Sequence, residues 1–125
     1  MQTKSLNTPS GGAAEPEVIE HECIEMDRLA HQTKVFGRPI QLKYKEFKVL
    51  WLLLRYKGAV VRVRDINEKL YGDPLGEREQ TVAGLVSKIR EKIGSEAGAL
   101  IQNVLGMGYR IEGRPSRKIP QGSSN

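Results

Sequence analysis

The sequence predicts an α+β fold with an N-terminal antiparallel sheet, a three-helix core and a C-terminal β-hairpin. Three patterns support this order. Apolar and polar residues alternate from Val18 to Leu42, helical periodicity runs from Lys45 to Ile93, and two short apolar runs flank Gly106. We expect one folded domain at residues 18–112, preceded by a flexible tail or linker at residues 1–17 and followed by a flexible tail at residues 113–125.

Length and composition limit the class of protein. The 125 residues are enough for about one domain, and 38% hydrophobic and 28% charged residues are typical of a soluble globular protein. The longest apolar run, Val49 to Leu54, is far shorter than the ~20 residues of a membrane span, and no signal peptide is recognisable. The single cysteine, Cys23, fits a reducing compartment, so we expect a cytoplasmic protein.

The N-terminal sheet is predicted from period-two patterning. Ile24 and Met26 share one face of a strand, with acidic residues on the other face. Residues 29–35 and 40–42 are expected as further strands around a hairpin turn at residues 36–39. The turn contains a glycine suited to a positive φ, and its proline belongs at a strand start or a sheet edge.

Two helices and a hairpin are predicted around the third helix. Residues 45–56 are apolar on nearly all sides, which indicates a buried core helix. Residues 63–71 form a second helix closed by Gly72, and residues 72–78 form a loop. Residues 100–104 and 109–111 are expected to pair as a C-terminal hairpin.

The third helix is predicted from Gln80 to Ile93, with Gly94 ending it. Four aliphatic residues recur on one side, at the spacing of a 3.6-residue helix. These anchors are Val82, Val86, Ile89 and Ile93. The other side forms a narrow polar ridge of Gln80, Gly84, Ser87, Lys88 and Glu91, flanked by Thr81, Leu85 and Lys92. Such a ridge is slim enough for a DNA major groove, which is roughly 12 Å wide.

Charge is unevenly distributed along the chain. Residues 1–42 contain four basic and six acidic side chains, whereas residues 43–125 contain sixteen basic and nine acidic ones. The net charge of the second segment is therefore +7, which favours a polyanionic partner, with nucleic acid the first candidate.

Six motifs in order resemble one family, the OmpR/PhoB-type winged helix-turn-helix domain, from about Cys23 to Ile111. They are Ile40-x-Leu42-x-x-Lys45-Glu46-Phe47, Gly58-x-Val60-Val61, Leu70-Tyr71-Gly72, Thr81-Val82, Ser87-x-Ile89-Arg90-x-Lys92-Ile93 and Val104-x-Gly106-x-Gly108-Tyr109-Arg110-Ile111. The resemblance implies a DNA-binding transcriptional regulator with its third helix in the major groove and its hairpin wing at the minor groove or backbone.

The resemblance also implies partners. Family members commonly follow a phosphoacceptor receiver domain in two-component response regulators, and they usually bind direct repeats as head-to-tail homodimers. The residues before the domain are too few for a receiver, so we expect either the effector part of a response regulator or a stand-alone regulator. The loop after the second helix resembles a segment that contacts RNA polymerase. Its residues here are Asp73, Pro74, Leu75, Glu77 and Arg78.

Several positions depart from the family pattern. Gln80 stands where an arginine is frequent, and Ala83-Gly84-Leu85 replaces Asp-Val-His. Leu105 occupies the position of a minor-groove arginine. Lys43 and Arg62 replace the usual Thr and Ser caps of the first two helices, each of which is worth ~1 kcal/mol. We therefore expect salt-sensitive DNA affinity with modest direct base readout.

The candidate contacts fall into two sets. Base-facing candidates are Gln80, Thr81, Gly84, Leu85, Ser87 and Lys88. Phosphate or wing candidates are Tyr71, Arg90, Lys92, Asn103, Leu105, Tyr109 and Arg110. Gly84 either lets the helix settle deeper in the groove or reflects lost DNA reading. Leu85 either contacts a thymine methyl group or likewise reflects the loss of DNA reading. Packing is the alternative role for the two tyrosines.

The sequence suggests two other classes of function. His21, Cys23 and His31 are conceivable metal ligands, but no fourth ligand and no structural zinc spacing accompany them. We expect no enzyme and no cofactor. The alternative to DNA binding is a winged-helix protein-interaction module, which Leu85 and Leu105 favour as apolar residues on the outer face.

Overall fold

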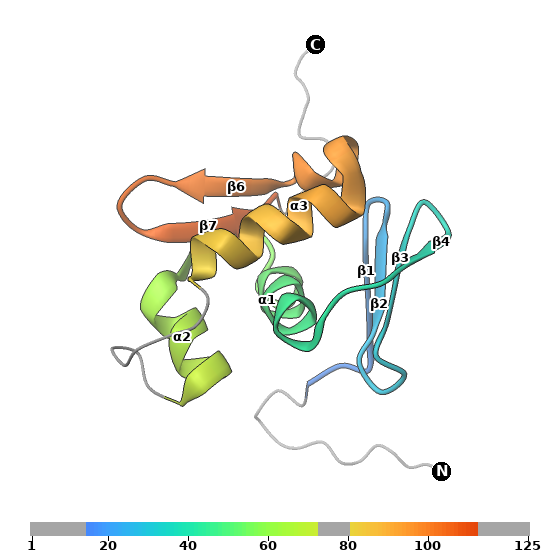
Figure 1. Cartoon of the computed structure of the whole chain (residues 1–125), viewed down its shortest axis with the longest axis horizontal. Coiled ribbons are helices and arrows are strands. Elements are labelled where there is room, and N and C mark those ends of the chain that lie inside the picture. Colours follow the sequence, from blue (N-terminus) through green and yellow to red (C-terminus); the bar gives the residue numbers. More distant parts are fainter. Residues whose placement is uncertain (1–14, 73–80, 113–125) are drawn as a thin grey trace.

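The computed structural model contains a four-stranded sheet, three helices and a three-stranded sheet, one strand of which comes between the first two helices along the chain (Figure 1). The structure describes residues 15–72 and 81–112. Its elements are β1 (Val18–His21), β2 (Ile24–Asp27), β3 (Gln32–Val35), β4 (Arg38–Ile40), α1 (Tyr44–Arg55), β5 (Val61–Arg62), α2 (Val63–Tyr71), α3 (Val82–Gly98), β6 (Ile101–Val104) and β7 (Gly108–Ile111). The predicted α+β fold and element order are confirmed.

The N-terminal sheet is antiparallel, with strand order β1-β2-β3-β4. Ile24 and Met26 are buried and alternate with their acidic neighbours, as predicted. The predicted strand at residues 29–35 is shorter, because the Asp27 carboxylate accepts the backbone N–H of Ala30 (3.0 Å) and closes a turn before β3. The predicted strand at residues 40–42 is also shifted: β4 ends at Ile40.

The turn between β3 and β4 occupies two residues. Phe36 and Gly37 both have positive φ angles, of 52° and 78°. Positive φ at both central residues is the conformation that matches the twist of a two-residue hairpin. Pro39 lies on β4, the edge strand of this sheet, where its missing N–H removes no ladder hydrogen bond, as predicted.

Helix α1 is the centre of the core. Nearly all of its apolar side chains are buried, and it packs against α2, α3, β1 and β7. Helix α2 ends at Gly72 in a left-handed conformation, as predicted. Among the described helices, none has the length and apolarity required to cross a membrane.

Helix α3 packs against α1, and the four predicted aliphatic anchors of α3 are all buried. Gly94, with φ 94° and ψ 168°, interrupts the helix where the sequence predicted its end. Residues 95–98 then form a further helical segment. Ala97 is buried against the core, which gives this segment an apolar anchor of its own.

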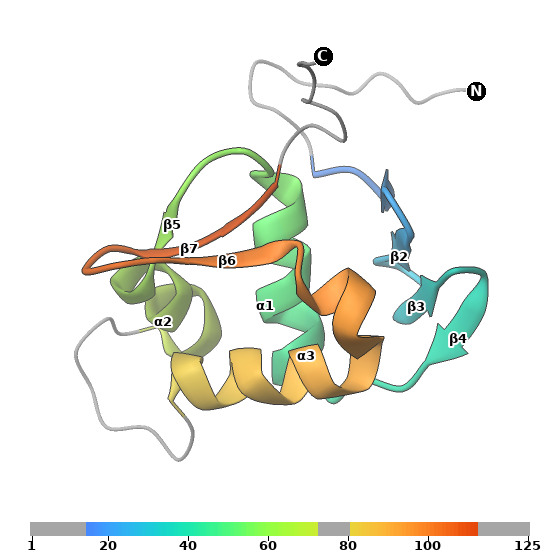
Figure 2. The same ribbon diagram turned by 90° about the horizontal axis from the view of Figure 1, so that it is seen from above.

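The C-terminal hairpin belongs to a three-stranded sheet of order β5-β7-β6 (Figure 2). Strand β5 was not predicted; it pairs Val61 with Tyr109 and Arg62 with Gly108. The backbones approach so closely here that a Cβ atom at position 108 would lie 2.1 Å from the Val61 carbonyl oxygen. Gly108 is therefore required for β5 to join the wing.

The segment Glu15–Glu17, which the sequence assigned to the tail, lies against the folded domain. Arg28 Nε donates to the Pro16 carbonyl (3.0 Å), and the Arg28 N–H donates to the Glu17 carbonyl (2.7 Å). The remainder of the two predicted tails, residues 1–14 and 113–125, lies outside the described residues.

Candidate nucleic-acid interface

The outward face of α3 is small and polar. Thr81, Gly84, Ser87 and Lys88 are exposed there, as is Glu91 one turn further on. The Thr81 hydroxyl accepts the Gly84 N–H (3.0 Å) and so caps the helix. A Cβ atom at position 84 would lie 3.2 Å from that hydroxyl oxygen, so glycine leaves room for the cap. The N-terminal half of α3 thus presents backbone and short side chains.

Leu85 does not belong to this face. Its side chain is only 1% exposed and packs in the core with the four aliphatic anchors. The prediction that Leu85 faces outward is wrong, because positions 82, 85 and 89 are spaced by three and four residues and share one side of a helix. The apolar stripe is wider than the sequence analysis assumed, and Leu85 supports neither a thymine contact nor a protein-interaction surface.

Lys92 is held by a buried carboxylate on α1. Its Nζ lies 2.7 Å from Glu46 Oε1, which also accepts the backbone N–H of Lys43 (2.9 Å). Glu46 is 1% exposed. Burial alone raises the pKa of its carboxyl, but the hydrogen bonds from Lys92 and Lys43 outweigh burial and hold the pKa below its ordinary value. Glu46 also caps α1, where Lys43 supplies no side-chain cap.

Arg90, on the other side of α3, also has a partner within the chain. Its Nη2 donates to the Ile101 carbonyl (2.7 Å), which ties α3 to the first strand of the wing. From the sequence, Arg90 and Lys92 were expected to contact DNA phosphates. Both side chains have partners within the chain, so their first effect is to fix the orientation of α3.

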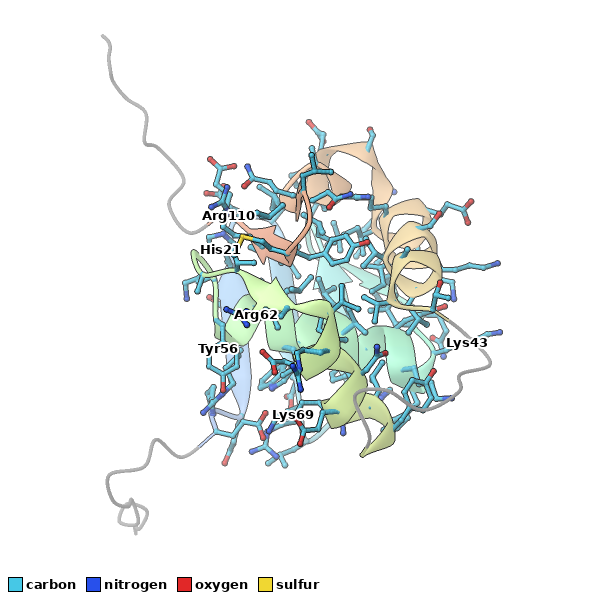
Figure 3. The ribbon with its side chains drawn as sticks, turned by 90° about the vertical axis from the view of Figure 1, so that its left-hand side faces the viewer. His21, Lys43, Tyr56, Arg62, Lys69 and Arg110 are labelled. Atoms are coloured by element: carbon cyan, nitrogen blue, oxygen red, sulfur yellow. The ribbon has the colours of Figure 1, made fainter. Side chains whose placement is uncertain are left out.

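The wing candidates are distributed over both faces of the hairpin. Leu105 is 94% exposed at its tip, and Asn103 is also exposed. Tyr109 is buried, which agrees with the packing alternative. Arg110 Nε donates to Gln102 Oε1 (3.0 Å), and in Figure 3 Arg110 lies on the side of the molecule away from α3.

The remaining sequence-predicted contacts are partly placed. Tyr71 is half-buried, with Lys45 Nζ 4.8 Å above its ring. Gln80 and the polymerase-loop candidates lie outside the described residues. The wing tip and the start of α3 both lie on the side of the molecule opposite the four-stranded sheet (Figures 1 and 2). The start of α3 and the wing tip, which carries Leu105, therefore share one side of the molecule.

Arg62 is a candidate that the sequence analysis missed. It is exposed on β5, opposite Gly108 of the wing, between the hairpin and α2 (Figure 3). Arg64 is exposed in the first turn of α2. The β-branched run Val60-Val61 before a helix was the available signal for a short strand at this position.

The three conceivable metal ligands do not converge. His21 donates to the Glu112 carbonyl, whereas the His31 ring stacks on Phe47 with centroids 4.1 Å apart. Cys23 lies in a separate, acidic pocket with Glu22 and Glu96. Within residues 15–72 and 81–112, no three His, Cys, Asp or Glu side chains are grouped to hold a metal ion.

Three helices between an N-terminal sheet and a C-terminal hairpin define a winged helix-turn-helix domain. Residues 37–111 match the family described as "Transcriptional regulatory protein, C terminal". The chain belongs to this family, which contains the OmpR/PhoB-type effector domains.

Sequence relatives of known role agree with this assignment. The chain is 28% identical over 111 residues to the response regulator protein PmrA of Pseudomonas aeruginosa, covering 89% of the chain and 48% of PmrA. It is 34% identical over 96 residues to the transcriptional regulatory protein CutR of Streptomyces coelicolor, covering 77% of the chain and 43% of CutR. The chain spans about half the length of the curated relatives it matches.

Solved structures share the fold. The DNA-binding domain of Klebsiella pneumoniae RstA, crystallised with the RstA box, superposes with a TM-score of 0.68 at 20% identity, covering 79% of this chain and all of that one. The Thermotoga maritima response regulator DrrB, described as an OmpR/PhoB homolog, gives a TM-score of 0.66 at 25% identity, covering 78% of this chain and 45% of DrrB.

Proposed function

We propose that this domain is a DNA-binding transcriptional regulator that inserts α3 into a major groove and lays its wing along the adjacent minor groove or backbone. One observation carries the proposal: the outward face of α3 is polar, narrow and exposed, and the start of α3 lies on the same side of the molecule as the wing tip. The family assignment supports the same role.

The described residues divide into three roles. Ser87 and Lys88 are the proposed base-reading side chains, with Lys88 suited to guanine O6 and N7. Thr81 and Gly84 keep the start of the helix compact, so that its backbone approaches the groove closely. Arg62 and Arg64 are proposed phosphate contacts, which position the domain without reading sequence.

Leu105 is proposed to enter the minor groove at the wing tip. Minor-groove binders use apolar side chains such as leucine and methionine against base steps. Gln80, Asn103 and Arg110 remain proposed contacts from the sequence, whereas Arg90 and Lys92 act first as anchors of α3.

The proposal is tested by titrating the 125-residue chain with duplex DNA at several salt concentrations. The logarithm of the association constant should fall linearly with the logarithm of salt concentration. Lys88→Ala should weaken binding, and a selection from random duplexes should show relaxed preference at its base. Arg62→Ala should instead weaken all sequences alike and reduce the salt slope by about one.

Lys57→Ala is the matched control, because Lys57 is exposed in the turn after α1 and belongs neither to α3 nor to the wing. It should leave affinity nearly unchanged. If duplex DNA does not bind at low salt, the alternative function is favoured.

That alternative is a winged-helix protein-interaction module. Its remaining support is the wing tip, where Leu105 is 94% and Met107 50% exposed. The burial of Leu85 removes the second observation on which it depended.

The finer assignments belong to the same proposal. We place the domain in the cytoplasm, as the effector part of a response regulator or as a stand-alone regulator. The relatives described as response regulators are about twice as long as the matched segment.

We propose binding to direct repeats as a homodimer and a contact between residues 73–78 and RNA polymerase. Analytical ultracentrifugation on duplexes with one or two sites tests the first of these.

A further inference from the structure

A groove of about 480 Å³ runs along the outer side of α1, between the N-terminal sheet and α2. Two of its lining residues, Tyr56 and Lys69, are labelled in Figure 3, below the hairpin. None of the described α3, β5 or wing residues that we propose to contact DNA lines the groove.

The floor of the groove is aromatic. The His31 ring stacks on Phe47 with centroids 4.1 Å apart, and Phe47 is nearly parallel to Trp51 with centroids 6.4 Å apart. Trp51 is buried, and its indole N–H donates to the carboxylate of Glu15, which also lines the groove. Flat, rigid side chains of this kind give contact area at low entropic cost.

The rim of the groove is cationic. Arg28, Lys48, Arg55 and Lys69 line it, and among the lining residues that the structure describes Glu15 is the only acidic one. Lys48 Nζ lies 5.4 Å from the centroid of the Tyr44 ring. Within the part of the chain that the structure describes, neither Lys48 nor Lys69 forms a salt bridge. Two positive charges at this rim thus remain available to an anionic partner.

The segment Glu15–Glu17 shows how the groove holds such a partner. The Glu15 carboxylate accepts the Trp51 indole N–H and lies 3.8 Å from Arg28 Nε. The Arg28 guanidinium also donates to the carbonyl oxygens of Pro16 (3.0 Å) and Glu15 (3.4 Å). The contacts are made to one carboxylate and to main-chain carbonyls, and an extended acidic peptide presents both groups at regular intervals.

We propose that this groove binds an acidic, extended segment of a partner protein, with carboxylates at Lys48 and Lys69 and the main chain over the aromatic floor. The chain's own residues 1–14 do not fit this role, because they contain one lysine and no acidic residue. The proposal does not depend on DNA binding, since none of the groove's described lining residues is a proposed DNA contact.

The probe is a fluorescein-labelled (Glu-Ala)5 decapeptide, with (Gln-Ala)5 as the isosteric uncharged control. Fluorescence anisotropy of the 125-residue chain at low salt measures binding. Trp51 is the single tryptophan of the chain, so its emission reports occupancy of the groove with unlabelled peptide. We expect (Glu-Ala)5 to bind at least tenfold more tightly than (Gln-Ala)5 and to change the Trp51 emission.

The following variants test whether peptide binding requires the groove lysines or only the overall positive charge of the chain. Lys48→Ala and Lys69→Ala should each weaken binding about two- to fivefold. Lys48→Arg, which keeps the charge, should retain affinity, so that a folding defect is recognised. Lys88→Ala is the matched control on α3 and should leave peptide binding unchanged. Glu15→Gln should tighten binding, because the resident carboxylate no longer competes for Trp51 and Arg28.

Four results would overturn the proposal. The first is equal binding of (Gln-Ala)5, and the second is equal weakening by Lys88→Ala. The third is tighter, lysine-dependent binding of a ten-nucleotide oligothymidylate, which would identify a phosphate-binding surface. The fourth is concentration-dependent self-association that the Lys48 and Lys69 variants abolish, because the groove would then take the acidic surface of a second copy. That surface comprises Glu20, Glu22, Glu25 and Glu96.

Discussion

Among single residues, Glu46 and Lys92 determine how firmly α3 is held on α1. Glu46 is buried, and its carboxylate accepts hydrogen bonds from the Lys92 ammonium and from the backbone N–H of Lys43, the N-cap residue of α1. Removing one partner of a buried pair costs more than the pair contributes, because the other charge stays buried without compensation. The Lys92 side chain is 30% exposed, which moderates that cost.

Lys92→Met should lower the free energy of unfolding at pH 7 by about 2 kcal/mol. The folded-state pKa of Glu46 lies below its unfolded value, so the unfolded state binds more protons between the two values, and stability falls as pH drops through that window. Urea titrations at pH 7 and at about pH 3.5, below the ordinary glutamate pKa of about 4.3, measure this. The destabilisation should shrink at the lower pH.

Glu46→Gln supplies the control, since it removes the titrating group. The part of the acid dependence that arises from Glu46 should disappear in this variant. A Lys92→Met deficit that is the same at both pH values would show that the ion pair does not hold α3.

At the scale of elements, the start of α3 combines a cap and a glycine. Thr81 caps the helix through the Gly84 N–H, and Gly84 is exposed on the proposed groove-facing side. The sequence left two meanings for this glycine: close approach to DNA, or loss of DNA reading. They differ in what a single added methyl group should do.

Gly84→Ala should raise helix stability by up to about 1 kcal/mol, reduced by the 3.2 Å contact with the Thr81 hydroxyl. If the glycine serves close approach, the same substitution should weaken duplex binding, because the methyl group holds the backbone away from the base edges. Thermal unfolding and duplex titration of one preparation measure both effects. Unchanged duplex affinity with unchanged or raised stability would support the second meaning.

The elements also show what sequence patterns could and could not predict. The helices, the N-terminal sheet and the hairpin follow from local periodicity, which requires only neighbouring residues. Strand β5 has two residues and exists because β7 pairs with it from 48 positions away, at Val61 and Tyr109. No local pattern encodes such a pairing.

The same limit applies to the candidate site. The four aliphatic anchors of α3 were predicted correctly, but Leu85 lies at the edge of their stripe, where one residue of helical rotation decides between core and solvent. The partner of Lys92 is 46 residues away and that of Arg90 is a main-chain carbonyl. Nothing in the sequence indicates these internal partners, so Lys92 and Arg90 were both predicted to contact DNA phosphates.

For the whole molecule, α1 joins the two sheets into one core. It packs against β1 on one side and β7 on the other, and buried residues of both sheets belong to one hydrophobic cluster with α2 and α3. Neither sheet has an independent core among the described residues. Such an arrangement favours a single cooperative unfolding transition, because loss of α1 exposes every other element.

Urea unfolding followed by Trp51 fluorescence and by far-ultraviolet circular dichroism should therefore give coincident curves. Trp51 reports α1 and the groove beside the N-terminal sheet, whereas circular dichroism averages over all helices and strands. Leu85→Ala, which opens a cavity between α1 and α3, should shift both curves together to lower urea, by about 2–4 kcal/mol in the free energy of unfolding. Two separated transitions, or a shift of the circular dichroism curve alone, would show that the N-terminal sheet and the helix-wing unit unfold independently.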